Sequence, residues 1–341
     1  LRDCLGQLVE GLSALHGFGL LHRDLKPSNA VVTTKGRVVL LDFGLVTHLL
    51  PDQQASEGLS VGTVAYMAPE QAEGRRVGTA ADVYALGVMA AQHLLQAGEV
   101  STGLDAARRS LAQVGLSMAE SALSALLRIL WNRFVTALLL LRGVRTLPSL
   151  ASADRLQLDT LHALERPLTW TVFLSGGELA TQYIRRALSA GEPGHLARAL
   201  ATEAIWLTMQ APSETARPDA HLHRARELTA SRSDGSLDAF LLYASAQVEF
   251  LRWRLPETAR DLASAEQLYR LTCAGEQWNL TNARTPILLT MAVAGQMKEL
   301  SRCASEWALD AERRGITVLK LNVGDPDLSP PPAFLKAVGS I

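Results

Sequence analysis

The N-terminal part of the chain contains the octapeptide HRDLKPSN, which occupies residues 22–29. Two shorter motifs follow it in order, DFG at residues 42–44 and APE at residues 68–70. Each triplet alone is a weak signal. All three in this order, with a predicted strand hairpin between the first two, form a strong one.

The flanking residues predict a helix before the octapeptide and a β-hairpin after it. One face of the helix carries Leu5, Leu8, Val9, Leu12 and Leu15. Gly17 and Gly19 end that helix. Two β-branched runs, 29–33 and 37–41, surround the turn residues 34–36 and predict the two strands. A turn-rich stretch follows at 51–62, and a further helix is expected from about Pro69.

With these motifs, the segment resembles the eukaryotic-like Ser/Thr protein kinases, bacterial members included. The resemblance covers about a quarter of the chain and the middle of a kinase domain. It implies a transferase that moves the γ-phosphate of ATP to Ser or Thr of a protein substrate in signalling, with magnesium as cofactor. The implied fold is mainly α, a partial kinase C-lobe (helix, β-hairpin and activation segment) followed by an α-helical hairpin-repeat array.

The resemblance assigns the chemistry to a few positions. Asp24 orients the substrate hydroxyl and accepts its proton, and Lys26 neutralises charge on the transferred phosphoryl group. A lysine at that position indicates Ser/Thr rather than Tyr specificity in the family. Thr63 fixes the geometry of the substrate hydroxyl. Asn29 and Asp42 supply oxygen ligands for magnesium and, with Lys26, bind the cofactors.

Other positions are implied to be structural. His22 packs inside the protein and is not a metal ligand, Phe43 completes the DFG motif, and Gly44 lets the backbone turn sharply. Glu70 pairs with a later arginine in the family, and Asp82 braces the catalytic loop from a helix.

One further group of residues is implied to be regulatory. Arg23, next to Asp24, can bind a phosphorylated residue of the activation segment through charge-assisted hydrogen bonds. Ser56 and Ser60 are the candidates for that modification, and the alternative is that both are ordinary loop serines.

Several parts of the kinase pattern have no counterpart. No G-x-G-x-x-G precedes the octapeptide, and no lysine precedes Lys26, so the N-terminal lobe that would hold ATP is absent and the chain looks truncated. After Val88 the family pattern also stops, and no later arginine is identified as a partner for Glu70. We therefore expect a truncated catalytic domain over 1–89, with a seam near 89–90.

Residues 90–314 have the pattern of consecutive amphipathic helices. Short breaks recur at 97–99, 190–192, 254–256 and 294–296, and residues 148–167 and 231–236 are expected to be connecting loops. Two predicted stripes are Leu104, Ala107, Leu111 and Val114, and Leu262, Ala265, Leu268 and Tyr269. The region resembles a degenerate tetratricopeptide array, and an unrelated helical bundle is the alternative. It could bind a partner protein.

A third piece, 315–341, contains prolines and breaks the helical pattern. Its sequence around Asn322 to Asp327 resembles the N-terminal segment of class I pyridoxal-phosphate aminotransferases. The alternative is a poorly ordered proline-containing tail, and in either case no transaminase activity is expected.

Composition limits the remaining possibilities. The formal charge is −1, from 33 basic and 34 acidic residues, which argues against a nucleic-acid partner. The most apolar run, 134–141, is much shorter than the ~20 residues that cross a bilayer, so no membrane segment is expected. Three widely spaced cysteines form no disulfide framework, which favours the cytoplasm.

Three hypotheses remain on the sequence alone. The first is a Ser/Thr protein kinase of the bacterial multidomain type, although activity of this chain by itself is not expected without the missing lobe. The second is a catalytically dead kinase remnant that acts as a helical-repeat scaffold for protein interactions. The third is a mis-assembled reading frame with no native function. The coding sequence upstream of Leu1 would distinguish the first from the third.

Overall fold

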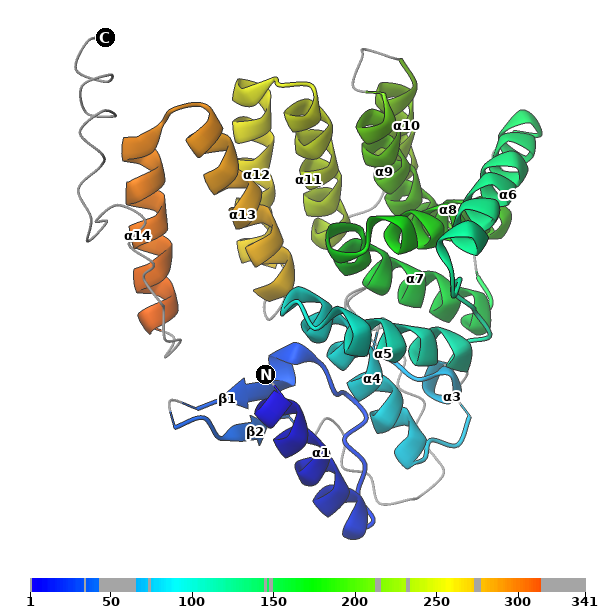
Figure 1. Ribbon diagram of the computed structural model, residues 1–341, viewed down its shortest axis with the longest axis vertical. Coiled ribbons are helices and arrows are strands. Elements are labelled where there is room, and N and C mark those ends of the chain that lie inside the picture. Colours follow the sequence, from blue (N-terminus) through cyan, green and yellow to red (C-terminus); the bar gives the residue numbers. More distant parts are fainter. Residues whose placement is uncertain are drawn as a thin grey trace.

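The computed structural model describes residues 2–33, 35–42, 66–72, 75–143, 146, 150–211, 216–230, 234–272 and 277–313. In this part of the chain the protein is mostly helical, with one two-stranded sheet near the N-terminus (Figure 1). The elements are α1 (Arg2–Gly17), η1 (Pro27–Asn29), β1 (Ala30–Val32), β2 (Val38–Leu40), α3 (Pro69–Ala72), α4 (Thr79–Gln96), α5 (Val100–Gln113), α6 (Ala122–Leu141), α7 (Ser152–Thr171), α8 (Phe173–Ala190), α9 (Pro193–Gln210), α10 (Ala216–Thr229), α11 (Gly235–Leu251), α12 (Leu255–Thr272), α13 (Gln277–Val293) and α14 (Met297–Arg313).

The predicted helix and hairpin at the N-terminus are confirmed. α1 buries Leu8 and Leu12, and Gly19 follows the helix with a φ of 72°, a conformation that costs glycine little. β1 and β2 are antiparallel, with Ala30 opposite Leu40. Val9 was expected on the buried face, but it is 49 % exposed, because only a narrow side of α1 contacts the rest of the protein.

Consecutive helices then pair as hairpins. α4 packs on α5, α7 on α8, α9 on α10, and α11 on α12, while α13 and α14 continue the row (Figure 1). Of the four short breaks expected from the sequence, 97–99 and 294–296 lie between helices, whereas the other two overlap helix ends, since α8 ends at Ala190 and α12 begins at Leu255. At one of them Gly191 has a φ of 69° and its N–H caps α8 on the Ala187 carbonyl. This arrangement agrees with the expected partial C-lobe followed by a helical array.

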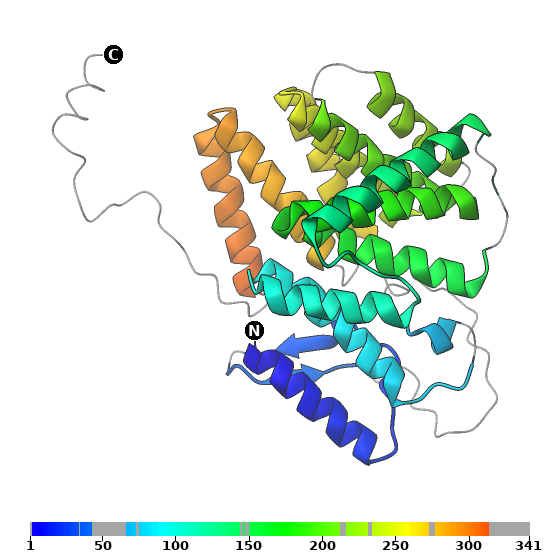
Figure 2. The same cartoon turned by 45° about the vertical axis from the view of Figure 1, so that its right-hand side comes forward.

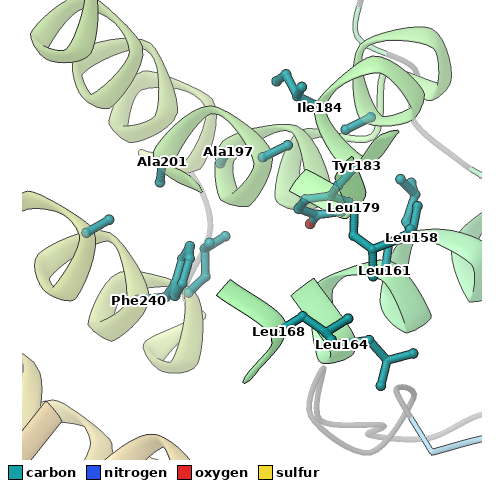
Figure 3. Close-up of a cluster of buried hydrophobic side chains, with 14 of the residues drawn as sticks. Leu158, Leu161, Leu164, Leu168, Leu179, Tyr183, Ile184, Ala197, Ala201 and Phe240 are labelled. Carbon is teal, nitrogen blue, oxygen red and sulfur yellow. The ribbon is translucent and has the colours of Figure 1, made fainter. Parts of the chain in front are cut away.

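One hydrophobic core joins the helices of both pieces. It extends from Ala68 and Tyr84 through α7, α8 and α9 to Ile287 in α13. Figure 3 shows its centre, where Leu161, Leu164 and Tyr183 converge. The hydroxyl groups of Tyr84 and Thr160 lie 2.8 Å apart and add a polar link between α4 and α7. The helical region therefore covers part of the apolar surface of the kinase-like piece, while Phe18 and Val83 stay exposed.

The expected loop at 148–167 is wrong for most of its length, since α7 begins at Ser152. Pro167 lies inside this helix and cannot donate to the Ala163 carbonyl one turn earlier. The side-chain amide of the buried Gln92 in α4 donates to that carbonyl instead, at 3.0 Å. A proline in this helix is thus compensated by a neighbouring helix, which the sequence pattern could not reveal.

The expected seam at 89–90 falls within the continuous helix α4, and no loop separates the two pieces there. The domain limits 1–89, 90–314 and 315–341 stay predictions. The tail at 315–341 and residues 231–233 lie outside the described residues, and the loop expected at 231–236 is wrong at its end, since α11 begins at Gly235.

α6 differs from the other helices. Among the described residues it is the one helix whose length and composition would suffice to cross a membrane, although a test of this kind is weak evidence for a single helix. The apolar run noted in the sequence, 134–141, is only the end of this helix, which extends from Ala122 to Leu141 and includes Arg128 and Arg133. It packs on α8 and leaves most of its surface uncovered by described residues (Figure 2).

Candidate catalytic loop

The octapeptide forms the loop between α1 and β1. Leu25, at its centre, is 2 % exposed and packs with Leu8 and Leu12 of α1 and with Ala85 and Met89 of α4. Because an apolar side chain in mid-loop is fixed in this small core, the neighbouring Asp24 and Lys26 are left partly exposed. The burial of Leu25 between two polar residues thus leaves the carboxylate of Asp24 and the ammonium group of Lys26 at the surface.

A buried carboxylate holds the start of this loop. Asp82 of α4 is 1 % exposed and accepts hydrogen bonds from the backbone N–H groups of His22, at 2.9 Å, and Arg23, at 2.8 Å. Its Oδ2 also lies 2.8 Å from His16 Nε2 of α1. Arg23 has a φ of 64°, a left-handed conformation that costs a non-glycine residue of order 1–3 kcal/mol. The two hydrogen bonds to Asp82 offset that strain.

The catalytic-type side chains of the loop contact one another. Lys26 Nζ lies 2.8 Å from Asp24 Oδ2. The side-chain amide of Asn29 donates to the same oxygen at 3.0 Å and to the Asp24 backbone carbonyl at 2.8 Å. The aspartate is therefore oriented by a cation and an amide that share its Oδ2, and no described residue is seen to contact its Oδ1.

The hairpin brings Asp42 next to this group. The N–H of Leu41 donates to the Asn29 carbonyl at 2.7 Å, so the residue after Leu41 emerges beside the end of the loop. Since the nitrogen of the Asn29 amide donates to Asp24, its oxygen is directed elsewhere, and among the described residues it accepts a hydrogen bond from Ser28 alone, at 3.3 Å. An amide oxygen and an exposed carboxylate fit a magnesium ion, which takes one or two protein oxygens together with phosphate.

No cluster of three or more His, Cys, Asp and Glu side chains suited to a metal occurs in the described part of the chain. The two proposed magnesium ligands do not amount to such a cluster, because one of them is an asparagine. The residues Phe43, Gly44, Ser56, Ser60 and Thr63 lie outside the described residues, so their expected roles stay predictions.

Two residues that were not predicted to do so support the loop, Gln71 directly and His16 through Asp82. Gln71, which follows the APE motif, donates from its side-chain amide to the Arg23 carbonyl at 2.7 Å. His16 reaches Asp82 from the last turn of α1. Glu70, expected to be structural, is half-buried, whereas Ala68 of the same motif is fully buried. The position of Gln71 directly after the motif was the available sequence signal.

Comparisons with known proteins agree with this geometry. Residues 1–120 match the family model described as the protein kinase domain. The chain is 47 % identical over 91 residues to "Probable serine/threonine-protein kinase PkwA" of Thermomonospora curvata, which covers 27 % of this chain and 12 % of that protein. It is 42 % identical over 87 residues to the serine/threonine-protein kinase drp72 of Corynebacterium efficiens, covering 26 % and 17 %. It is 44 % identical over 91 residues to the serine/threonine-protein kinase pkn2 of Myxococcus xanthus, covering 25 % and 11 %.

The N-terminal third of the chain is therefore similar to the catalytic domain of protein Ser/Thr kinases. The chain spans less than a fifth of the length of these three curated relatives. No solved structure matches the chain. The likeness of residues 90–314 to tetratricopeptide repeats and of the tail to aminotransferases stays a prediction.

Proposed function

We propose that residues 1–120 form the substrate side of a protein Ser/Thr kinase that transfers the γ-phosphate of ATP to a Ser or Thr hydroxyl of a protein. The observation that supports this most directly is the group of Asp24, Lys26 and Asn29, joined by contacts of 2.8–3.0 Å. The Asp82 side chain holds the same loop by accepting hydrogen bonds from its backbone N–H groups. Positioned groups of this kind are what phosphoryl transfer requires, because the reaction depends on orientation and charge neutralisation.

Each group has one part in the reaction. The substrate oxygen forms a bond to the γ-phosphorus as the bond to the ADP oxygen breaks, and Asp24 accepts the proton of the hydroxyl. General-base groups contribute roughly 10²–10⁴ to rates. Lys26, 2.8 Å from Asp24, is placed to reduce the negative charge near the transferred group. Asn29 and Asp42 would hold magnesium, which when bound neutralises charge on the phosphates.

The groups that surround the ATP phosphates in the family have no counterpart in the printed sequence. Losing a phosphate-binding loop and its lysine removes much of the electrostatic stabilisation of the transferred phosphoryl group. We therefore propose that efficient transfer requires an ATP-binding lobe joined before residue 1, and that the 341 residues alone transfer phosphate weakly or not at all.

The test is phosphate transfer from labelled ATP with magnesium to a generic basic protein. It compares the 341-residue chain, the same chain fused to the ATP-binding lobe of a similar kinase, and an Asp24→Asn variant of the fusion. We expect transfer by the fusion, a loss of at least about 100-fold in the Asp24→Asn variant, and label on Ser and Thr only. An Asp105→Asn variant, altered on the exposed side of α5, should match the unaltered fusion.

Absence of transfer in a fusion shown to be folded would contradict the proposal and favour the scaffold hypothesis.

Beyond the kinase segment, we propose that residues 90–314 bind a partner protein and that the protein acts in the cytoplasm. The helical hairpins provide the surface for such a partner, and the absence of a disulfide framework is the reason for the location.

A further inference from the structure

α6 has its polar and apolar faces reversed. Its buried residues are Ala125, Asn132 and Thr136. Its exposed large side chains are all apolar: Leu123, Leu126, Leu127, Leu130, Trp131, Phe134, Leu138, Leu140 and Leu141, from 37 to 84 % exposed. A surface helix of a globular protein normally shows the opposite pattern, with its apolar face inward. An uncovered apolar face of this extent marks an interaction site.

Polar contacts fix this orientation. Arg128 forms an ion pair of 3.1 Å with Glu178 of α8, a carboxylate that is fully buried. Arg133 forms an ion pair with Glu203 of α9. Arg185 of α8 donates to the Asn132 side chain at 2.9 Å. The helix cannot rotate to bury its apolar face without leaving buried charges unpaired, which is strongly unfavourable.

The same contacts argue against a lipid surface as the occupant of the exposed face. A helix that binds at a membrane interface usually carries Lys and Arg on its polar face, available to anionic lipid. The two arginines within α6 are instead directed into the protein and paired with carboxylates. The exposed face carries no charge, so a complementary partner surface must itself be apolar and uncharged.

The exposed side chains follow a pattern that suits a second helix. The residues Leu123, Leu127, Leu130, Phe134, Ala137 and Leu141 are spaced alternately by four and three positions, and all are exposed. This is the spacing of the seam in paired helices. The six positions are also placed symmetrically about Asn132, which lies on the opposite, buried face.

We propose that α6 is a dimerisation helix, and that the exposed face packs antiparallel against α6 of a second copy of this chain. An antiparallel pair related by a two-fold axis at position 132 brings Leu130 to Phe134 of the other copy and Leu127 to the smaller Ala137. The outermost pair is Leu123 with Leu141, the two inner pairs each join side chains of different size or shape, and no charge enters the interface. Such a self-complementary contact is the commonest form of homo-oligomer interface.

The test measures the mass of the full chain in solution by light scattering over a concentration series. We expect twice the 36.8 kDa of one chain for the unaltered protein and the single-chain mass for Leu130→Glu, with a dissociation constant raised by at least about 30-fold. Leu271→Glu is the matched control, because Leu271 of α12 is also a highly exposed leucine on a helix, 74 % against 65 % for Leu130. Its dimer should be unaffected, and circular dichroism should show all three proteins equally helical.

A mixed sample tests the antiparallel arrangement. Leu130→Glu and Phe134→Lys should each be monomeric alone and should form a dimer when mixed, since the two altered positions face each other across the pair. A monomeric unaltered chain, or a Leu130→Glu variant that still dimerises, would overturn the proposal. So would a monomer that cosediments with phospholipid vesicles in a Leu130-dependent way, which would assign the face to lipid. Failure of the mixture to associate would overturn the antiparallel pairing.

Discussion

The kinase-like segment and the helical region each bury an aspartate, and the two aspartates differ in how many hydrogen bonds compensate their burial. Asp82 of α4, 1 % exposed, accepts two backbone N–H groups and lies within hydrogen-bonding distance of His16. Asp159 of α7, 5 % exposed, has one ion-pair contact within the described part of the chain, with His195 at 3.5 Å. No described residue hydrogen-bonds to its second oxygen. Burial raises the pKa of Asp159 to about 7.

The difference follows from what holds each region together. The loop around Asp82 rests on a small core of five buried residues, so its conformation depends on polar contacts. The region around Asp159 belongs to a core that extends over most of the helices. There apolar packing fixes the fold, and a poorly compensated carboxylate is tolerated although it reduces stability. Asp82 thus positions the loop of the kinase-like segment, whereas Asp159 lowers the stability of the helical region.

The largest effect is expected from removing the first of these carboxylates. Asp82→Ala leaves two backbone N–H groups without their acceptor and releases the strained conformation of Arg23. We expect a loss of about 3 kcal/mol in the free energy of unfolding, measured by urea denaturation. Asp105→Ala, which removes an exposed aspartate of α5, is the control and should change stability by less than about 0.5 kcal/mol. Equal stability of the two variants would refute the role given to Asp82.

The second aspartate should behave in the opposite way. Since the folded-state pKa of Asp159 is raised, the folded protein favours the protonated form, and this contribution to stability is lost as pH rises from about 4 to about 7. Asp159→Asn should therefore lessen the fall in stability over that interval and stabilise the protein at pH 8 by about 2 kcal/mol.

Thermal unfolding at pH 5 and pH 8 measures this effect. The pKa of Glu165, raised by burial to about 8, extends the same trend in the unaltered chain to higher pH. The control Asp154→Asn changes an exposed residue of the same helix and should follow the unaltered protein. A variant that is less stable than the unaltered chain at pH 8 would show that Asp159 is well compensated after all.

A smaller effect is expected where the two regions meet. The Ala163 carbonyl accepts a hydrogen bond from Gln92, because Pro167 has no N–H group to donate to it. Gln92→Ala removes this donor. We expect a loss of about 1–2 kcal/mol in unfolding free energy, measured by denaturation. Gln113→Ala, at the exposed end of α5, should be close to neutral. A neutral Gln92→Ala would mean that the part of α7 around Pro167 needs no support from α4.

Local patterns predicted much of the kinase-like segment. Leu8 and Leu12 marked the buried side of α1, and the runs around Gly36 marked the hairpin, because both signals are confined to a few neighbouring residues. Asp24, Lys26 and Asn29 were found through their motif, and the structure brings them together. The contact of Gln71 with the loop was missed, since it joins residues 48 positions apart.

The helical region was harder to predict for the same reason. α7 was expected to be a loop because Pro148 and Pro167 bracket it, and its compensation by Gln92 is a tertiary contact. The length of the apolar helix α6 was underestimated because Arg128 and Arg133 interrupt its apolar sequence. Only the structure shows that both arginines are paired with carboxylates of α8 and α9, and that the apolar face is the exposed one.

Asp82 holds the loop of residues 22–29 in a defined conformation before any substrate binds. Amide hydrogen exchange of the full chain, resolved to single residues, tests it directly. We predict that the His22 and Arg23 amides are protected, and that Asp82→Asn speeds their exchange at least about tenfold while the amides in the middle of α8 are unchanged. Rapid exchange of these two amides in the unaltered protein, or the same rate in the variant, would contradict the claim.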